Sequence, residues 1–244
     1  MKPSLSVVIP VLNEAENIGK AVEAVLRAIN DSNINQYEII ISDNGSTDGT
    51  RDVIEEMESH NPHIKHVYPT ENLGSGQAVR DGLKVATSEY SAYVVGDNEM
   101  TEEALHNLFG ALGKADIINT YISNPEVRAL PRQILSANFG RLMRLFFGVK
   151  LKYFTGPAII RTDLFRAARR STYGFAFMAE ILVQIIKAGY SYYQVPMPLQ
   201  PRTYGEPGVY RLKDMWRVFK AVFSMFFNVH FSGAVSNLRN LKKK

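Results

Sequence analysis

Apolar runs rich in β-branched residues alternate along the chain with segments whose apolar residues recur every three or four positions. The runs cover residues 4–11, 37–43, 64–69, 91–97 and 115–121. Between them, residues 48–60 and 74–88 have the helical period. Strands that alternate with helices form a mostly parallel sheet that helices flank. The pattern therefore predicts an α/β fold.

The first predicted helix follows the first apolar run, with Asn13 as its N-cap. Glu14 and Glu16 then fall in its first turn, where acidic side chains favour the positive end of the helix dipole. The alternation weakens after residue 121, where two prolines and two arginines predict a mobile loop over 122–133. The predicted elements that follow are helices at 134–148 and 175–188, a strand at 190–198 and a loop at 199–211.

Residues 211–244 have a helical pattern of their own, so we divide the chain into a domain of residues 1–210 and an amphipathic basic helix and tail. Lys220, Asn228 and His230 interrupt the apolar run before it reaches the roughly 18 residues that a membrane-spanning helix needs. The segment contains 8 Lys/Arg and one acidic residue, which suits an anionic lipid surface. A helix packed on the domain with a solubilising tail fits the pattern equally well.

The composition narrows the classes of protein. The chain has 244 residues, of which 45% are hydrophobic, so it can bury a sizeable core. It has no cysteine, which excludes disulfides, thiolate metal sites and cysteine nucleophiles and suits a reducing compartment. The first residues lead directly into a strand pattern without the features of a secretion signal. We therefore expect a cytoplasmic protein.

Charge is distributed unevenly along the chain. Residues 1–121 contain 8 Lys/Arg and 19 Asp/Glu, whereas residues 122–244 contain 20 and 5. The net charges of −11 and +15 account for the overall +4. The split favours a cation or neutral ligand in the first half and anions, such as phosphates or an acidic membrane, in the second. An inert dipolar surface would show the same split.

Acidic side chains follow three of the predicted strands. In an open parallel sheet, ligands bind beyond the carboxyl ends of the strands. These ends read Pro10 to Glu14, Asp43 to Asp48 and Asp97 to Glu99. Asp43 could accept hydrogen bonds from a ribose or a base edge, although turn and cap chemistry alone would also explain this segment.

Two further features suggest a nucleotide and a cation. Gly74 and Gly76 lie at a loop-to-helix junction, where backbone N–H groups can approach an anion. They do not form a dinucleotide fingerprint, because Val79 stands where that motif needs glycine. Asp97 and Glu99 flank Asn98 after a strand, and such hard oxygen ligands can hold Mg²⁺ or Mn²⁺ bridging a diphosphate.

Five motifs in order resemble those of inverting family 2 glycosyltransferases of the GT-A fold. They are "VVIPVLNEAENI", "SDNGSTDGT", "NLGSGQAVRDGLKVA", "VVGDNE" and "GFAFMAEILVQIIKAGYSYYQVPMPLQPR". The likeness covers about residues 4–212 and is greatest to enzymes that glycosylate polyprenyl phosphates, such as dolichyl-phosphate mannosyltransferase and undecaprenyl-phosphate glucosyltransferase. It implies a Rossmann-like GT-A domain with a mostly parallel central sheet.

The resemblance also implies roles on the donor side. The residues expected to bind the nucleotide sugar are Pro10, Asn13, Glu14, Asp43, Gly74, Gly76, Asp97, Asn98 and Arg202. Asp97 and Glu99 occupy the positions of the D-x-D metal ligands, so the implied cofactor is Mg²⁺ or Mn²⁺. Asp97 is the firmer of these two expectations, because glutamate is atypical at the second position.

On the acceptor side the resemblance implies that Arg128 and Arg132, with Ser136 nearby, hold a polyprenyl phosphate. Residues 122–170 contain 10 Lys/Arg and 2 acidic residues, which suits an anionic acceptor, although the arginines could also merely solvate a loop. The expected reaction moves a hexose at the inner membrane face. The expected enzyme is peripheral, with a possible membrane-protein partner and no nucleic-acid partner.

Two alternatives stay open. A phosphate monoester needs no strong base at neutral pH, but a hydroxyl acceptor would, and Glu180 is then the candidate base unless it is a packed helix carboxylate. A non-catalytic nucleotide-sugar-binding protein is the other alternative. The departures from the family pattern, at Tyr153 and in Glu206-Pro207-Gly208, lie on the acceptor side. The donor side is therefore better supported than the acceptor.

Overall fold

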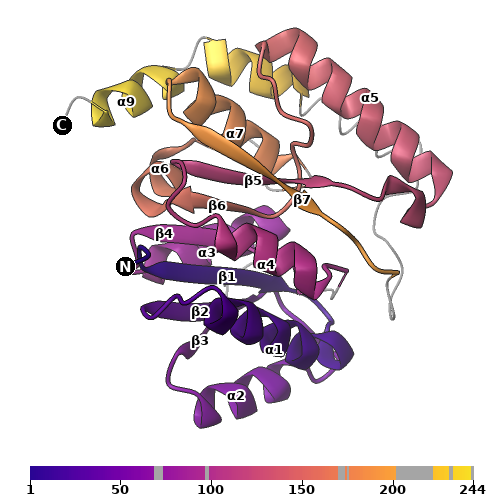
Figure 1. Ribbon diagram of the computed structural model, residues 1–244, viewed down its shortest axis with the longest axis vertical. Helices are drawn as coiled ribbons and strands as arrows, with labels where there is room; N and C mark the ends of the chain where they lie inside the picture. The colour runs from indigo at the N-terminus through magenta and orange to yellow at the C-terminus, as the bar shows by residue number, and fades with distance from the viewer. Residues whose placement is uncertain are drawn as a thin grey trace.

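The strands of this computed structural model form one sheet in the order β3-β2-β1-β4-β6-β5-β7 (Figure 1). The structure describes residues 1–68, 74–96, 99–169, 174, 176–201, 222–230 and 233–242. The strands are β1 (Leu5–Val11), β2 (Tyr37–Asp43), β3 (Ile64–Val67), β4 (Tyr90–Tyr93), β5 (Ile117–Ile122), β6 (Ala158–Arg161) and β7 (Tyr192–Met197).

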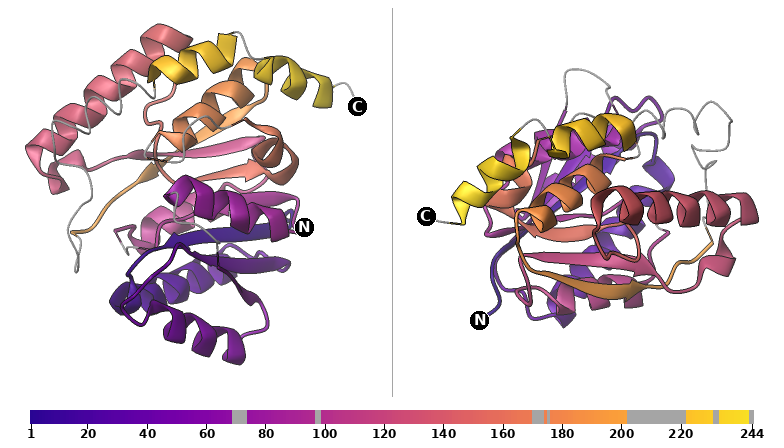
Figure 2. Two further views of the ribbon diagram at one scale, coloured as in Figure 1. Left: turned by 180° about the vertical axis from the view of Figure 1, so that it is seen from behind. Right: turned by 90° about the horizontal axis from the view of Figure 1, so that it is seen from above.

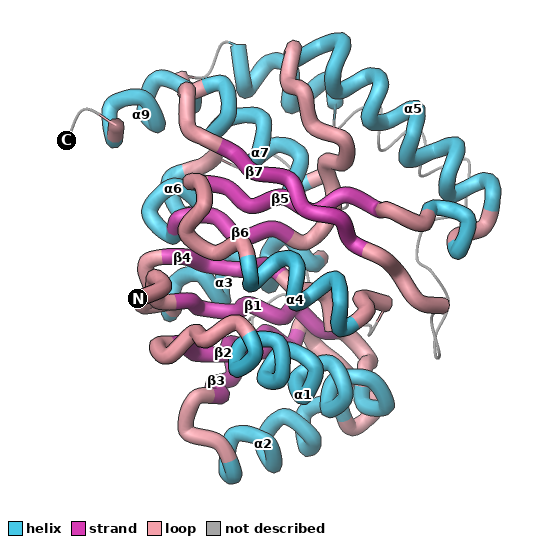
Figure 3. Tube along the Cα trace, in the orientation of Figure 1, coloured by secondary structure: helices cyan, strands magenta, loops and turns pink. Residues whose placement is uncertain are grey.

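Helices cover both faces of this sheet (Figures 1 and 3). They are α1 (Ala15–Asp31), α2 (Thr50–His60), α3 (Ser75–Val85), α4 (Glu102–Gly110), the 3-10 turn η1 (Pro125–Val127), α5 (Leu130–Phe147), α6 (Thr162–Ala167), α7 (Phe177–Lys187) and α9 (Ala234–Leu241). Residues 222–230 are also helical. The two faces therefore have separate hydrophobic clusters.

Alternate residues of each strand enter opposite clusters. Val7 and Ile9 of β1 are buried with α1, α2 and α4, whereas Val8 between them is buried with α3, α6 and α7. Ile39 and Ile40 of β2 divide in the same way. Because successive side chains of a strand point to opposite faces, a sheet covered on both sides needs continuous apolar runs. The runs that predicted the strands are the interior of this two-sided sheet.

The predicted α/β fold with a mostly parallel sheet is confirmed, and its one antiparallel strand was not predicted. β6 pairs antiparallel with β4 and β5, while the other neighbouring strands pair parallel. The four residues of β6 lie between the predicted helices at 134–148 and 175–188, where no element was predicted. A short apolar run gives little periodicity from which to assign a strand.

Three predicted boundaries are wrong. Glu14, not Asn13, is the N-cap of α1, because Asn13 has a positive φ of 56°. α5 begins at Leu130, inside the predicted loop, with a proline in its first turn, where the missing N–H costs little. β4 ends at Tyr93, several residues before the acidic triplet.

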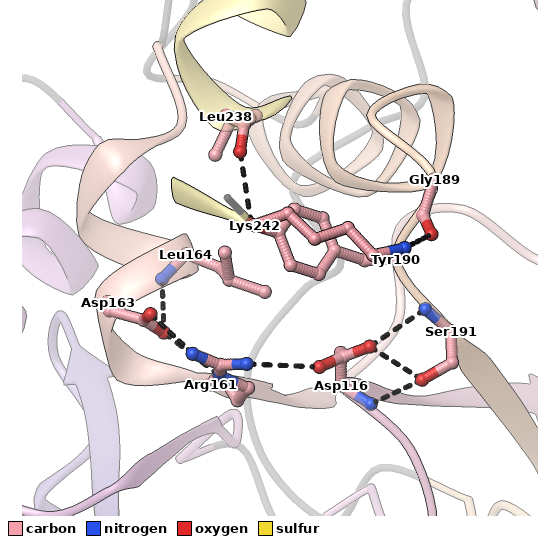
Figure 4. Close-up of polar contacts among 9 residues, drawn as sticks. All are labelled: Asp116, Arg161, Asp163, Leu164, Gly189, Tyr190, Ser191, Leu238 and Lys242. Carbon is pink, nitrogen blue, oxygen red and sulfur yellow. Dashed lines mark hydrogen bonds and ion pairs between the residues drawn. The ribbon is translucent and has the colours of Figure 1, made fainter. Parts of the chain in front are cut away.

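The C-terminal part of the chain packs on the domain. Tyr190 donates a hydrogen bond from its hydroxyl to the Leu238 carbonyl of α9 at 3.0 Å, and Lys242 Nζ donates to the Gly189 carbonyl at 2.6 Å (Figure 4). Burial raises the pKa of Tyr190, which keeps this hydroxyl protonated as a donor. Met225 and Leu238 are fully buried in the cluster around α7, and Figure 2 shows the yellow C-terminal helices beside the orange helix α7. Of the two interpretations of this segment, packing on the domain is therefore observed for its described residues.

Exposed apolar side chains gather on the outer faces of α5 and the 222–230 helix. The exposed large residues there are Leu130, Ile134, Leu142, Leu145, Phe146, Phe223 and Phe227. The rings of Phe146 and Phe226 lie 6.1 Å apart, so the two helices meet on this side. We call these residues the apolar rim. Within the described residues, no helix has the length and hydrophobicity to cross a bilayer.

Candidate functional site

The loops that follow β1 and β2 are hydrogen-bonded to each other. Asn13 donates its backbone N–H to Ser46 Oγ at 2.8 Å and accepts the Thr47 N–H on its side-chain oxygen at 2.9 Å. The Glu14 N–H donates to Thr50 Oγ1 at 2.9 Å. Parallel strands bring these loops to the same edge of the sheet, as the strand-end pattern predicted.

Carboxylates hold the same two loops in shape. Asp43, only 4% exposed, accepts the Ser46 N–H at 3.0 Å. Asp48 accepts from the Ala15 N–H at 3.2 Å and from the Thr50 hydroxyl at 2.5 Å. Partial burial acts to raise the pKa of Asp48, but hydrogen bonds from Thr50 and Ala15 outweigh it and keep that pKa below its usual value. Asp48 therefore supplies the acceptor for the first turn of α1 that the capping residue does not provide.

The glycine junction borders a cavity of about 170 Å³. Gly74, with a φ of 98°, is the N-cap of α3, so the first N–H groups of that helix face this end of the sheet. Ser75 lines the cavity together with Glu99, Arg132 and Tyr153. The sequence motif thus lies beside groups that come from three other segments of the chain.

Glu99 faces the two arginines that the sequence predicted to hold the acceptor. Its two carboxylate oxygens lie 3.4 Å from the two terminal nitrogens of Arg132, and one of them lies 3.8 Å from Arg128 Nη2. The Glu99 and Arg128 side chains are each 10% exposed, and that of Arg132 is 31% exposed. The structure therefore brings together a predicted metal ligand and both predicted acceptor residues.

The segment that follows β7 holds Glu99 close to Arg128 and Arg132. The Asn124 side chain exchanges two hydrogen bonds of 2.8 Å with the Leu199 backbone, which fixes the loop that leads to Arg128. The Gln200 N–H donates to the Glu99 carbonyl at 3.0 Å, and Met100 forms a β-bridge with Leu199. One backbone segment thus holds Glu99 and the arginine loop on adjoining sides.

A second cavity of about 350 Å³ adjoins the first and is strongly cationic. Arg128, Arg132 and Tyr153 line both cavities. The other basic residues in its lining are Arg141, Arg144 and Lys152, and Ser136 lines it too. None of the described residues that line it is acidic. Five positive charges converge on one hollow, which attracts an anion.

Arg128 is held firmly but retains a donor. Its Nη1 donates to the Tyr153 hydroxyl at 3.2 Å, and Gln133 Nε2 donates to its carbonyl at 2.7 Å. Its Nε is buried and has no hydrogen-bond partner among the described residues. A buried donor without a partner is costly unless a ligand satisfies it.

Glu180 lies away from these cavities. It is fully buried in α7 and accepts a hydrogen bond from Asn228 Nδ2, on the 222–230 helix, at 3.2 Å. It is not among the described residues that line either cavity, although Phe177, one turn earlier, is. The structure thus places this candidate base toward the C-terminal segment.

Three predicted donor residues, Asp97, Asn98 and Arg202, lie outside the described residues, as do Glu206, Pro207 and Gly208. Of the remaining donor residues, Pro10 pairs with Ser42 in the buried sheet. The described residues do not by themselves fit a metal ion. They contain no group of three or more potential ligands, and Glu99 directs its carboxylate to the arginines.

Several cavity residues escaped sequence reasoning. Arg141, Arg144 and Lys152 contributed to the charge count, but their helix and loop positions gave no sign that they share one hollow. Tyr153 was noted only as a departure, and it contacts Arg128 directly. Arg144 donates to the Leu151 carbonyl at 3.2 Å, which folds its side chain back along α5 toward this loop. The amphipathic period of α5 was the one sequence signal that could have placed Arg141 and Arg144 on a common side of the helix.

Comparison with known proteins gives a consistent result. The sequence profile described as Glycosyl transferase family 2 matches residues 6–174. Glycosyltransferase AglE of Haloferax volcanii is 34% identical over 95 residues, which are 39% of this chain and 31% of that protein. Dolichol-phosphate mannosyltransferase of Pyrococcus furiosus is 26% identical over 212 residues, 83% of this chain and 58% of the relative. The chain thus spans about a third to somewhat over half of these relatives.

A solved structure agrees with the fold over most of the chain. Glucosyl-3-phosphoglycerate synthase from Mycobacterium tuberculosis, in complex with Mn²⁺, UDP and glucosyl-3-phosphoglycerate, has a TM-score of 0.64 and 19% identity. The match covers 93% of this chain and 80% of that one. The expected GT-A architecture is confirmed.

Proposed function

Because the chain belongs to glycosyltransferase family 2, we propose that it moves a hexose from a nucleotide sugar to a polyprenyl phosphate, with inversion at the anomeric carbon. The observation that supports this acceptor most strongly is the cationic cavity beside Glu99. Guanidinium groups match phosphate geometry bidentately, and a phosphate monoester has about −1.5 to −2 charges near neutral pH. Ser136, which lines the cavity, would donate a further hydrogen bond.

The proposed reaction does not need a strong catalytic base. A phosphate oxygen of the acceptor attacks the anomeric carbon, the new carbon–oxygen bond forms, and the bond to the nucleoside diphosphate breaks on the opposite face. A monoester with a second pKa of about 6 is already ionised near neutral pH, so no proton has to be removed first. Arg128 and Arg132 would orient this oxygen and keep the phosphate in the cavity. The burial of Glu180 against Asn228 is consistent with a reaction that does not need it.

We propose that the donor lies over the braced loops, with Asp43 toward the ribose or base and the α3 N-terminus toward the phosphates. Arg202 and Asn98 remain proposed donor contacts. We also propose dependence on Mg²⁺ or Mn²⁺ with Asp97 as a ligand, which the Mn²⁺- and UDP-bound relative supports. Such an ion, when bound, offsets the charge of a departing diphosphate.

The apolar rim supports a membrane location for this reaction, at the inner face. Phe223 is 60% exposed and Leu145 78% exposed, and these residues lie on helices whose other faces pack on the domain. Exposed apolar side chains on amphipathic helices, together with nearby cations such as Arg141, suit insertion into anionic headgroups. A prenyl chain could then remain in the bilayer while its phosphate enters the cavity. A membrane-protein partner could contribute to the same anchoring.

The decisive experiment is a transfer assay with radiolabelled nucleotide sugars. Label is expected in the organic phase only when polyprenyl phosphate and a divalent metal are both present. The same panel should include 3-phosphoglycerate and neutral sugars as acceptors, which tests a hydroxyl acceptor directly. A severe loss in Glu180→Gln but not in Arg132→Ala would favour that hydroxyl reaction. Absence of transfer from every UDP- and GDP-sugar would refute the proposal and leave a nucleotide-sugar-binding protein.

A further inference from the structure

Glu99 makes an unusual ion pair for a residue in a metal-ligand position. Both of its oxygens point to the terminal nitrogens of Arg132, and Arg128 lies beside them. The Glu99 side chain is 10% exposed, so it meets these two arginines in a largely dehydrated place. We propose that Glu99 is the internal counter-ion of the acceptor arginines, which a phosphate displaces, and that it is not a metal ligand.

The backbone around Glu99 favours this role. Gln200 bonds to its carbonyl and the next residue, Met100, bridges to Leu199, so the residue is fixed from its C-terminal side. Its side chain then extends into the cavity that Arg128 and Arg132 also line. A glutamate is one methylene longer than an aspartate and reaches further across such a gap. The atypical residue in the sequence motif thus acquires a physical reason.

The geometry also suits displacement. Charge-assisted hydrogen bonds between nitrogen and oxygen are normally about 2.7–2.9 Å long. The contacts of Glu99 with Arg132 and Arg128 are 3.4 to 3.8 Å long, whereas Lys65 approaches the carboxylate of Glu38 to 2.9 Å elsewhere in the sheet. These long contacts neutralise the two buried arginines at rest, and an anion that binds the arginines at shorter distances can replace them.

The incoming anion would find a donor that Glu99 does not satisfy. Arg128 Nε is buried and has no partner among the described residues. Phosphate has more acceptor oxygens than a carboxylate, so it can bond to Arg132 and to this nitrogen together. This second, independent observation indicates that the arginine pair accommodates more than Glu99.

The test measures binding, so it does not require sugar transfer. This inference rests on the proposed phosphate-bearing acceptor, and the probe is geranyl phosphate, a short water-soluble prenyl phosphate, titrated calorimetrically without metal. Glu99→Gln is expected to bind it about tenfold more tightly than the native protein, within the 5- to 150-fold range of coupled sites. Inorganic phosphate and 3-phosphoglycerate serve as parallel arms that separate prenyl from general phosphate recognition.

Glu102→Gln is the matched control. Glu102 is three residues further on and pairs with Arg27 at 2.7 Å, where both side chains are more than half exposed. The Glu102→Gln substitution removes one negative charge from the same region and does not contact Arg128 or Arg132. The affinity of this variant for geranyl phosphate should therefore stay within twofold of the native value. An equal gain in both variants would refute the counter-ion role and indicate a general charge effect.

Measurements of metal affinity show whether Glu99 is a counter-ion of the arginines or a metal ligand. Mn²⁺ affinity is measured by electron paramagnetic resonance with UDP or GDP, whichever binds more tightly. We expect Glu99→Gln to keep this affinity within threefold and Asp97→Asn to lose at least tenfold. A loss in Glu99→Gln equal to that in Asp97→Asn would overturn the proposal.

Glu99→Asp guards against a variant that fails to fold. Its shorter side chain withdraws from the arginines but retains a carboxylate, so geranyl phosphate should bind several-fold more tightly while Mn²⁺ affinity is unchanged. Unchanged phosphate affinity with tighter Mn²⁺ binding would instead establish position 99 as a metal ligand. Neither result depends on sugar transfer, so the counter-ion role of Glu99 can be tested even if the transfer assay fails. If neither the native protein nor any variant binds a phosphate probe, both the counter-ion role and the proposed phosphate-bearing acceptor are refuted.

Discussion

The proposed donor and acceptor sides of the site satisfy their polar groups in opposite ways. On the donor side, the loops after β1 and β2 exchange hydrogen bonds of 2.8 to 3.2 Å, and the carboxylates of Asp43 and Asp48 are engaged within them. On the acceptor side, five cations surround a hollow whose nearest described carboxylate, Glu99, lies at 3.4 to 3.8 Å from the arginines.

This difference indicates that the loops of the donor side have their final shape before a ligand binds. The donor loops already have the internal partners that fix their shape, so binding there need not order them. The acceptor side retains unbalanced charge and a buried donor without a partner, at Arg128 Nε. A charged cavity of this kind gains most from its ligand.

Removing Arg128 should affect the acceptor side most. Arg128→Ala removes one of the two described arginines that face Glu99, and loss of one partner of a buried ion pair costs about 3 kcal/mol of unfolding free energy. Transfer to prenyl phosphate should fall about 100-fold or more, as when one oxyanion donor is removed. Urea unfolding and initial rates measure the two effects. Equal losses of donor affinity and acceptor affinity would erase the contrast.

Glu38 provides a fully partnered carboxylate for comparison. Burial acts to raise its pKa, but hydrogen bonds from Ser6, Thr87 and Lys65 lower the pKa to about 2. Since the folded pKa is below the unfolded value of 4.5, its contribution is present above pH 4.5 and is lost as the pH falls toward 2. We expect native stability to decline by about 2 kcal/mol more than that of Glu38→Gln over this window. Parallel pH profiles of unfolding would contradict this.

Gly156 tests the support of the acceptor cavity. A Cβ there would lie 2.6 Å from Thr120 Oγ1 and 2.8 Å from the Tyr153 ring, so Gly156→Ala must displace the tyrosine that contacts Arg128. Overpacking of this kind costs about 1–2 kcal/mol. Acceptor KM should rise while donor KM stays constant. Gly19→Ala, whose added Cβ would meet no atom within 4 Å, is the matched control and should leave both unchanged.

Asp48 tests the donor side with the smallest expected effect. Asp48→Ala removes the acceptor for the Ala15 N–H and the Thr50 hydroxyl, which should cost about 1 kcal/mol, as for a lost helix cap. Nucleotide affinity, measured by calorimetry with UDP and GDP, should weaken, and geranyl phosphate affinity should not. The reverse pattern would mean that the two sides are coupled through this loop.

The inner strands β1, β2 and β4 were predictable because they are buried on both faces and therefore show continuous apolar runs. β6 was not predictable, since four residues give too little periodicity and its antiparallel pairing with β4 and β5 depends on distant segments. Of the charged residues that line the cavities, Glu99, Arg128 and Arg132 were candidates by type and place in the sequence, whereas Arg141, Arg144 and Lys152 were not. The contact of Glu99 with Arg132 was not predictable, because these residues are 33 positions apart and meet through the segment at Leu199 and Gln200.

The central claim is that Arg132 and its neighbours receive a phosphate-bearing acceptor. The most direct test compares two reactions of the Arg132→Ala variant: transfer from the nucleotide sugar to prenyl phosphate, and slow hydrolysis of the same donor by water. We predict that kcat/KM for transfer falls about 100-fold, whereas kcat/KM for hydrolysis stays within threefold of the native value. Equal changes in both reactions would contradict an acceptor role for this arginine.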